Sequence, residues 1–246
     1  MTAGRLPRSL TEYTATKNTE DWNPQMSGQV RIKAPSAPRS SPVLRPAVLP
    51  RDDWEDDTTL KGVAYDGAVV AGRSAEAVEA ERCRFENTRF TGTELRRSVL
   101  SDSYFDTCDF AQVRARDVSL IRCAITSSRL TGSSWAPGAF RDVRFDACRS
   151  DLALFRYSKF NAVVFADCNM QGADFQSAEF NSVRFVKCDL RGAQFSHANM
   201  RNVRFEGCDL SEINGATSFR GATVQGPGSM DLALLIAHET GVTIEA

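Results

Sequence analysis

The stretch from Asn161 to Leu210 reads NAVVF ADCNM QGADF QSAEF NSVRF VKCDL RGAQF SHANM RNVRF EGCDL when it is written in groups of five. Every group ends in Phe, Leu or Met, and the residue two places earlier is small or slim. A helical stripe recurs every 3.6 residues and a strand alternates every two, so neither explains a period of five. The chain must turn a corner once per group, which is typical of a solenoid.

The period extends in weaker form from Lys61 to Asn214, and fourteen of the 15 Phe residues fall in its large-residue phase. A second period of twenty residues aligns successive coils, so four corners close one square coil. The predicted core consists of large residues and cysteines that stack from coil to coil: Phe145, Phe165, Phe185, Phe205, Phe155, Phe175, Phe195, Cys148, Cys168, Cys188 and Cys208.

These groups resemble the pentapeptide repeat proteins, in which a small residue and a polar residue precede Leu or Phe. The pattern reads Cys-Asp-Leu at Cys188 to Leu190 and at Cys208 to Leu210, and Ala-Asp-Phe at Ala173 to Phe175. The resemblance implies an all-β fold, a right-handed quadrilateral parallel β-helix, here of about seven to eight coils. It says little about function, since fold alone does not fix activity.

We divide the chain into a disordered or extended tail (1–60), the repeat solenoid (61–225) and a C-terminal cap (226–246). The first 51 residues are rich in Pro and Ser and carry a net charge of +5. Such a tail is either a solvated segment without a partner or a docking segment for a protein or nucleic acid. The acidic run from Asp52 to Asp57 either folds back on the basic residues or solvates the entry to the solenoid. Residues Arg73 to Arg82 form either a weak coil or a short capping helix, because Ala and Glu dominate them.

After Asn214 the repeat decays, and Gly226, Pro227 and Gly228 break it. We predict a helix from Ser229, its N-cap, to about Glu239, and a final strand from Val242 to Glu245. Leu232, Leu235 and Ile236 form the apolar face of this helix. We expect them to cap the solenoid and to offer a homodimer interface, as the resemblance to gyrase-protecting family members implies.

No apolar run approaches the roughly 18 residues of a membrane helix, and no apolar segment follows Arg5 and Arg8, so we expect a cytoplasmic protein. An odd number of cysteines, seven, fits a reducing compartment. The cysteines form no CxxC pair, so we interpret them as small interior residues rather than metal ligands.

Two places in the repeat are irregular, and each either shapes a binding face or is repacked locally, while one charged stripe is a candidate contact surface. Ser150 lacks the large group of its phase, and we expect Leu152 and Leu154 to compensate for it. Around Trp135, Gly132 and Pro137 predict a bulged wall. Arg144, Arg184 and Arg204 share one wall and form the candidate interaction stripe.

The sequence contains no recognisable catalytic triad or metal-ligand spacing, so we expect neither enzymatic activity nor a cofactor. We expect a protein-interaction scaffold with an unidentified protein partner, for which the tail is one candidate docking segment. The resemblance gives one alternative, a DNA-mimicking protein that binds DNA gyrase and confers resistance to gyrase poisons. Mimicry of DNA needs a strongly negative rod. From Val63 onward, however, the chain has 21 basic and 23 acidic residues, so its net charge there is close to zero. Direct nucleic-acid binding is not expected either.

Overall fold

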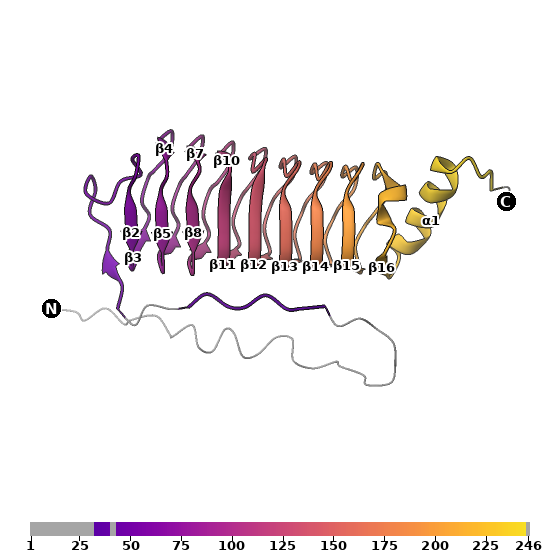
Figure 1. Cartoon of the computed structure of the whole chain (residues 1–246), viewed down its shortest axis with the longest axis horizontal. Helices are drawn as coiled ribbons and strands as arrows, with labels where there is room; N and C mark the ends of the chain where they lie inside the picture. The colour runs from indigo at the N-terminus through magenta and orange to yellow at the C-terminus, as the bar shows by residue number, and fades with distance from the viewer. Residues whose placement is uncertain (1–31, 40–42, 245–246) are drawn as a thin grey trace. The chain divides into compact units, whose positions relative to one another are not determined.

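The computed structural model describes residues 32–39 and 43–244. These residues form a parallel β-solenoid of about nine turns, closed at one end by a short helix. Figure 1 shows the coils as a row of short strands that ends in α1. The predicted β-helix is thus confirmed, and it has more coils than predicted because residues 61–80, where the repeat is weak, form a regular coil. The predicted tail residues 1–31 and 40–42 lie outside the described residues.

The strands are mostly three to nine residues long, and most of them belong to one 13-stranded sheet. Their bounds are β1 (Arg45–Pro46), β2 (Thr59–Lys61), β3 (Val63–Asp66), β4 (Ser74–Glu76), β5 (Glu79–Glu81), β6 (Arg84–Glu86), β7 (Glu94–Arg96), β8 (Val99–Ser101), β9 (Tyr104–Asp106), β10 (Arg114–Arg116), β11 (Val118–Thr126), β12 (Gly138–Asp146), β13 (Lys159–Ala166), β14 (Glu179–Val186), β15 (Asn199–Glu206) and β16 (Ala222–Gln225). A 3-10 helix, η2 (Ala216–Phe219), and the helix α1 (Gly228–Glu239) complete the elements.

Neighbouring coils pair in a register of twenty residues throughout the stack. Phe145 lies opposite Phe165, Phe165 opposite Phe185, and Phe185 opposite Phe205. Equivalent side chains therefore form columns that run along the stack, spaced by about 4.8 Å, the distance between neighbouring strands. The register departs from twenty residues at the two ends of the stack, at β16, where Ala222 pairs with Val203, and at β1, where Arg45 pairs with Val63.

The corners arise from one residue per group of five with a left-handed backbone. Every fifth residue from Asp57 to Glu212 has a φ between 47° and 68°, except Pro137, whose ring fixes φ at a negative value. Most of these residues are not glycine, although side chains disfavour this region. The hydrogen bonds between coils on either side of each corner hold them there, for example from Asn87 N to Asp106 O at 3.0 Å.

Stacked phenylalanine rings fill the interior. Along one column the ring centroids of Phe145, Phe165 and Phe185 are 4.7 and 5.0 Å apart, and those of Phe155 and Phe175 on the opposite side are 5.2 Å apart. Rings of adjoining columns also meet edge to face, as those of Phe155 and Phe160 do at 5.9 Å, which is a favourable aromatic geometry. A large apolar residue at every fifth position therefore gives a core without a second layer of structure.

The N-terminal end is covered by residues that precede the predicted boundary at 61. Trp54 is 1% exposed and packs edge to face on Phe85 and Phe90 at 5.9 and 5.1 Å. The acidic run folds back, since Asp52 pairs with Arg45 through two contacts of 2.6 Å. Residues 73–82 contain β4 and β5, so the alternative of a capping helix there was wrong.

The C-terminal end is closed by η2, β16 and α1. Phe219 of η2 stacks on Phe205 at 4.9 Å and so continues the aromatic column. The carboxylate of Glu239, at the end of α1, accepts hydrogen bonds from three backbone N–H groups at the start of η2. The predicted helix is present, but Ser229 is not its N-cap, because α1 begins at Gly228 and the Ser229 hydroxyl bonds Gly226 O instead. Residues 242–244 form no strand, contrary to the prediction.

No helix in the described part of the chain has the length and apolar character needed to cross a membrane.

Candidate functional site

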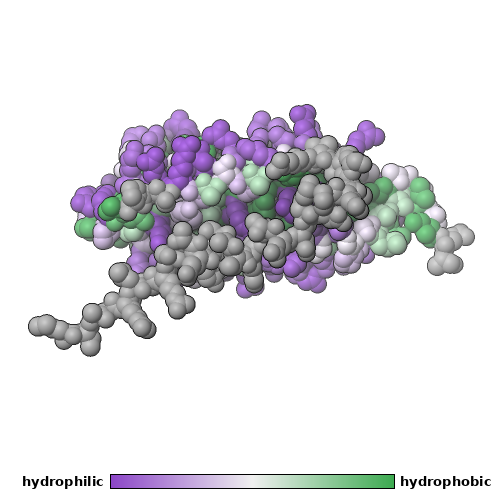
Figure 2. Space-filling model, turned by 90° about the horizontal axis from the view of Figure 1, so that it is seen from below, coloured by the Kyte–Doolittle hydropathy of each residue, from purple (hydrophilic) through white to green (hydrophobic). Residues whose placement is uncertain are grey.

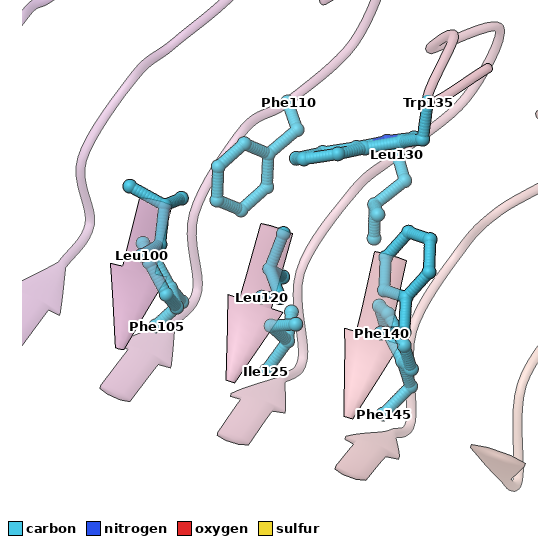
Figure 3. A pocket seen from close by; sticks show the side chains of 9 residues that line it. All are labelled: Leu100, Phe105, Phe110, Leu120, Ile125, Leu130, Trp135, Phe140 and Phe145. Atoms are coloured by element: carbon cyan, nitrogen blue, oxygen red, sulfur yellow. The ribbon is translucent and has the colours of Figure 1, made fainter. Parts of the chain in front are cut away.

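The interior of the described coils is packed around a small cavity. The internal cavity that lies beside Ile125 measures about 10 Å³, and it occurs where Ile125 stands between Phe105 and Phe145 in the column of stacked rings. Figure 3 shows that its lining is entirely apolar: Leu100, Phe105, Phe110, Leu120, Ile125, Leu130, Trp135, Phe140 and Phe145. A water needs roughly 10–15 Å³ and polar partners. This cavity is therefore too small to bind a substrate.

The seven cysteines lie in this interior as free thiols. Cys148, Cys168, Cys188 and Cys208 are each 2% exposed and form one column. Burial raises the pKa of Cys108 and of Cys123 to about 12. Within residues 32–39 and 43–244 no group of three His, Cys, Asp or Glu side chains is arranged to hold a metal ion.

The arginine stripe is one column of a wall, as its spacing implies. Arg144, Val164, Arg184 and Arg204 are successive register partners. Each arginine is paired with a carboxylate of the same wall: Arg144 with Asp146 at 3.0 Å, Arg184 with Glu206 at 2.9 Å, and Arg204 with Glu206 at 3.2 Å. The stripe is therefore a half-buried ladder of ion pairs rather than an unscreened row of positive charge.

The cap residues Leu232, Leu235 and Ile236 face the end of the coil stack. Leu232 is 7% exposed, and the other two are half-buried against the core. Other apolar side chains of this end are exposed, namely Met230, Leu234, Val242 and Ile244. Figure 2 shows hydrophobic residues in green at the C-terminal end, whereas hydrophilic residues in purple dominate the coil walls that are visible. A homodimer through this end stays a prediction.

The irregular coil around Ser150 differs from the prediction. Ser150 is buried at 1% exposure, whereas Leu152 and Leu154 point outward at 61% and 37%. They do not compensate for the missing large group, because they occupy a corner position and an outward position. Together with Tyr157, 62% exposed, they leave apolar surface on the outside.

One outer surface is already occupied by another part of the chain. Residues 32–39, which we call the strap, lie along a row of corner residues, which we call the corner column. The corner column consists of Arg82, Asp102, Arg122, Asp142, Ala162, Ser182 and Asn202. Ser36 N donates to Asp142 Oδ1 at 3.0 Å, and Arg39 N donates to Asp102 Oδ1 at 3.0 Å. Figure 1 shows the strap as an indigo trace that runs across several coils before the chain enters β1.

Side chains strengthen this contact. Lys33 Nζ lies 3.3 Å from Asp142 Oδ1, and the Tyr104 hydroxyl donates to Pro38 O at 3.2 Å. Arg122 holds Asp102 from within the column by two contacts, at 2.6 and 2.7 Å. The strap was missed by sequence reasoning, because Asp102 and Asp142 look like ordinary polar residues of the repeat and lie 63 and 106 positions from their partners.

The pKa values of the two carboxyl groups in the corner column, Asp102 and Asp142, are lowered. The Arg122 guanidinium, together with Arg39 N, holds the pKa of Asp102 below its ordinary value although burial opposes this. Burial acts to raise the pKa of Asp142, but the Ser36 N–H and the Lys33 ammonium outweigh it and lower that pKa. Both carboxylates are therefore charged at neutral pH and present acceptors to the strap.

The comparisons with known proteins agree with this fold. A family model described as "Pentapeptide repeat region" matches residues 139–214, and one described as "Pentapeptide repeats (8 copies)" matches residues 81–114. The chain belongs to the pentapeptide repeat proteins. No curated protein matches the chain.

Three solved structures are similar to this chain. Two of them are named as pentapeptide repeat proteins, and the third is named as a resistance protein. HetL, involved in heterocyst differentiation regulation in the cyanobacterium Nostoc sp. Strain PCC 7120, is 15% identical, with a TM-score of 0.26 over 69% of this chain and 87% of that one. Full-length QnrB1, a plasmid-mediated fluoroquinolone resistance protein, is 19% identical, with a TM-score of 0.23 over 75% and 100%. A protein of the Arabidopsis thaliana thylakoid lumen is 14% identical, with a TM-score of 0.28 over 56% and 68%. At these values the likeness says nothing about function.

Proposed function

We propose that this protein is a non-catalytic scaffold that binds a partner protein on the outer walls of its solenoid. The observation that carries the proposal is the strap itself. An outer surface of the coils already holds an extended peptide segment through hydrogen bonds from its backbone, at Ser36 and at Arg39. The same kind of contact serves an extended segment of another protein.

The construction of the coils supports this role. Each wall repeats one side-chain position about every 4.8 Å, and the coils are bonded to both neighbours over the length of the stack. A partner therefore meets a preformed surface, which reduces the cost of ordering groups on binding. The filled interior supports a role without catalysis, since a pocket that surrounds a small substrate has no place in it.

We do not extend the proposal to DNA mimicry. A mimic of a duplex needs a continuous negative surface. The wall that carries the arginine stripe alternates in sign, since Arg144 is paired with Asp146 and Arg184 with Glu206. The gyrase alternative therefore gains no observation that favours it.

Site-specific photo-crosslinking in the native host tests the proposal. One coil offers a matched set of outward positions on its four walls, five residues apart: Arg144, Arg149, Leu154 and Lys159. A photoreactive phenylalanine analogue replaces one of them at a time in the full chain. We expect the same partner to be crosslinked from one wall or from two adjoining walls. The absence of a discrete product from all four positions, or equal products from all of them, contradicts the scaffold role.

A further inference from the structure

The burial of the strap has a period of three residues. Ile32, Pro35 and Pro38 are half-buried, whereas Lys33, Ala34, Ser36, Ala37 and Arg39 are exposed. A left-handed polyproline II helix has three residues per turn and no internal hydrogen bonds, so every third side chain lies on the same face. The sequence from Pro35 to Pro38 also has prolines at positions one and four, the spacing that such helices present to their binding proteins. The strap therefore has the burial pattern of a polyproline II segment that lies on a surface.

The spacing of the coils fits this ligand. Ser36 and Arg39 are three residues apart, and the carboxylates that accept from their N–H groups, Asp142 and Asp102, are two coils apart. Two coil spacings measure about 9.6 Å. Three residues of polyproline II measure about 9.3 Å. Three residues of an α-helix would span only about 4.5 Å, so the corner column selects extended segments.

The carboxylate of Asp142 is satisfied by the strap. Its side chain is 9% exposed, and its hydrogen bond and its ion pair come from Ser36 N and Lys33 Nζ. The neighbouring corner residue Arg122 is engaged by Asp102, and Ala162 on the other side has no polar group. Asp142 is thus a nine-tenths buried acceptor whose donors lie on the bound peptide, which is the property of a binding site rather than of an internal ion pair.

From these contacts we infer that the corner column is a peptide-binding site for extended, basic segments of a partner protein that carry an apolar residue or proline at every third position. The strap is its resident ligand and competes with the partner. This inference rests on the proposed scaffold function and names the surface and the class of partner. The ligand presents free N–H groups to Asp142 and Asp102 directly after a proline, and a lysine three residues before the first of these groups.

The strap competes because it is tethered. Only about five residues separate Arg39 from β1, and a short tether gives an effective concentration on the order of 1 mM. An external peptide of equal intrinsic affinity therefore binds the intact chain weakly. Weakening the strap opens the site without touching the corner column.

A peptide titration of the full chain tests the inference. The probe is a fluorescein-labelled peptide with the sequence of residues 32–39, and its anisotropy is followed against the native chain and against an open variant with Lys33→Ser, Pro35→Gly and Pro38→Gly. The replaced residues lie outside the core, and matching circular dichroism and melting curves establish that the coils are intact. We expect the open variant to bind the probe at least about ten-fold more tightly than the native chain.

Second substitutions in the open variant locate the site. Asp142→Asn retains a residue that tolerates the left-handed corner but removes the charge, and we expect it to weaken probe binding by about five- to ten-fold. The matched control is Asp189→Asn on another wall, where the carboxylate pairs with Arg191, and it leaves probe binding unchanged. A probe with glycine in place of both prolines binds at least ten-fold more weakly.

The inference is overturned if the open variant binds the probe no more tightly than the native chain, or if Asp142→Asn leaves its affinity unchanged. A native chain that dimerises with increasing concentration, and stops doing so in the open variant, would assign the site to the strap of a second copy and so overturn the inferred partner. The scaffold role fails separately, through the absence of crosslinks from the four walls.

Discussion

The backbone N–H of Ser36 donates to Asp142 Oδ1 at 3.0 Å and joins two residues that are 106 positions apart. The bond joins a segment outside the repeats to a corner residue of β12 on the outside of the coil stack. The corner column is thus a surface on which the solenoid holds a segment from outside the repeats. The contact identifies which of the outer surfaces has the chemistry to bind an extended chain.

Asp142→Asn should loosen the strap in the native chain. The hydrogen bond from Ser36 N becomes neutral and the ion pair with Lys33 is lost, and charge-assisted hydrogen bonds contribute about 1–2 kcal/mol more than neutral ones. Trypsin cleavage after Lys33 and Arg39 should then accelerate by about three- to ten-fold, because cleavage follows the population of the detached segment. The control Asp189→Asn keeps the native rate, and an equal rate in both variants would show that Asp142 does not hold the strap.

The strap should stay attached over the whole neutral and mildly acidic range. The pKa of Asp142 and that of Asp102 are lowered from the ordinary value of 3.8, so their contribution is fully present above that value and is lost as pH falls through the lower pKa of the bound state. The other charged groups at the contact are Lys33, Arg39 and Arg122. The amide chemical shifts of Ser36 and Arg39 should be constant from pH 7 to about pH 4 and change only below it. A transition of these shifts between pH 5 and 7 contradicts this account.

The phenylalanine columns should dominate stability. Phe175 is fully buried and stacks between Phe155 and Phe195, at 5.2 Å from each. Phe175→Ala should lower the free energy of unfolding by about 3–5 kcal/mol, the typical cost of a large cavity in a core. Urea denaturation measures the change, and Tyr157→Ala on the exposed surface should alter it by less than about 0.5 kcal/mol. Comparable effects of the two substitutions would be inconsistent with the packing.

The thiols should be unreactive in the folded chain. With a pKa of about 12, Cys108 and Cys123 are thiolate in only about one molecule in ten thousand at pH 8, and the interior also excludes the reagent. A thiol reagent such as Ellman's should therefore label these two cysteines only after urea unfolds the coils. Rapid labelling of either one in the native chain, identified by mass spectrometry, contradicts their placement in the interior.

The coils could be predicted from the sequence because each group of five residues repeats the same pattern of large and small side chains. A large residue such as Phe165 and a small one such as Cys168 recur in fixed phases, and no other regular structure buries both. Where the repeat weakens, as in residues 61–80, the register of twenty still holds, because each coil pairs with a regular neighbour. The contribution of Trp54 was not predictable from periodicity, since it caps the stack from outside the repeat.

The strap contact could not be predicted from the sequence, because neither the strap nor its partners on the coils have a distinctive pattern. A period of three over eight residues is a weak signal, and only the prolines at 35 and 38 carry it. Asp102 and Asp142 occupy corner positions that Arg82, Ala162 and Ser182 fill elsewhere, so nothing in the repeat distinguishes them. Their role depends on the coil spacing matching an extended segment, which is a property of the folded stack alone.

Hydrogen exchange of the strap amides tests the central claim most directly. In the full native chain, measured by NMR at neutral pH, the N–H groups of Ser36 and Arg39 should exchange at least about ten-fold more slowly than those of Ala34 and Ala37, corrected for intrinsic rates. This alternation follows from the hydrogen bonds to Asp142 and Asp102. Uniform exchange of all four amides at the rates of a free peptide would contradict the account, because the corner column would then hold no segment.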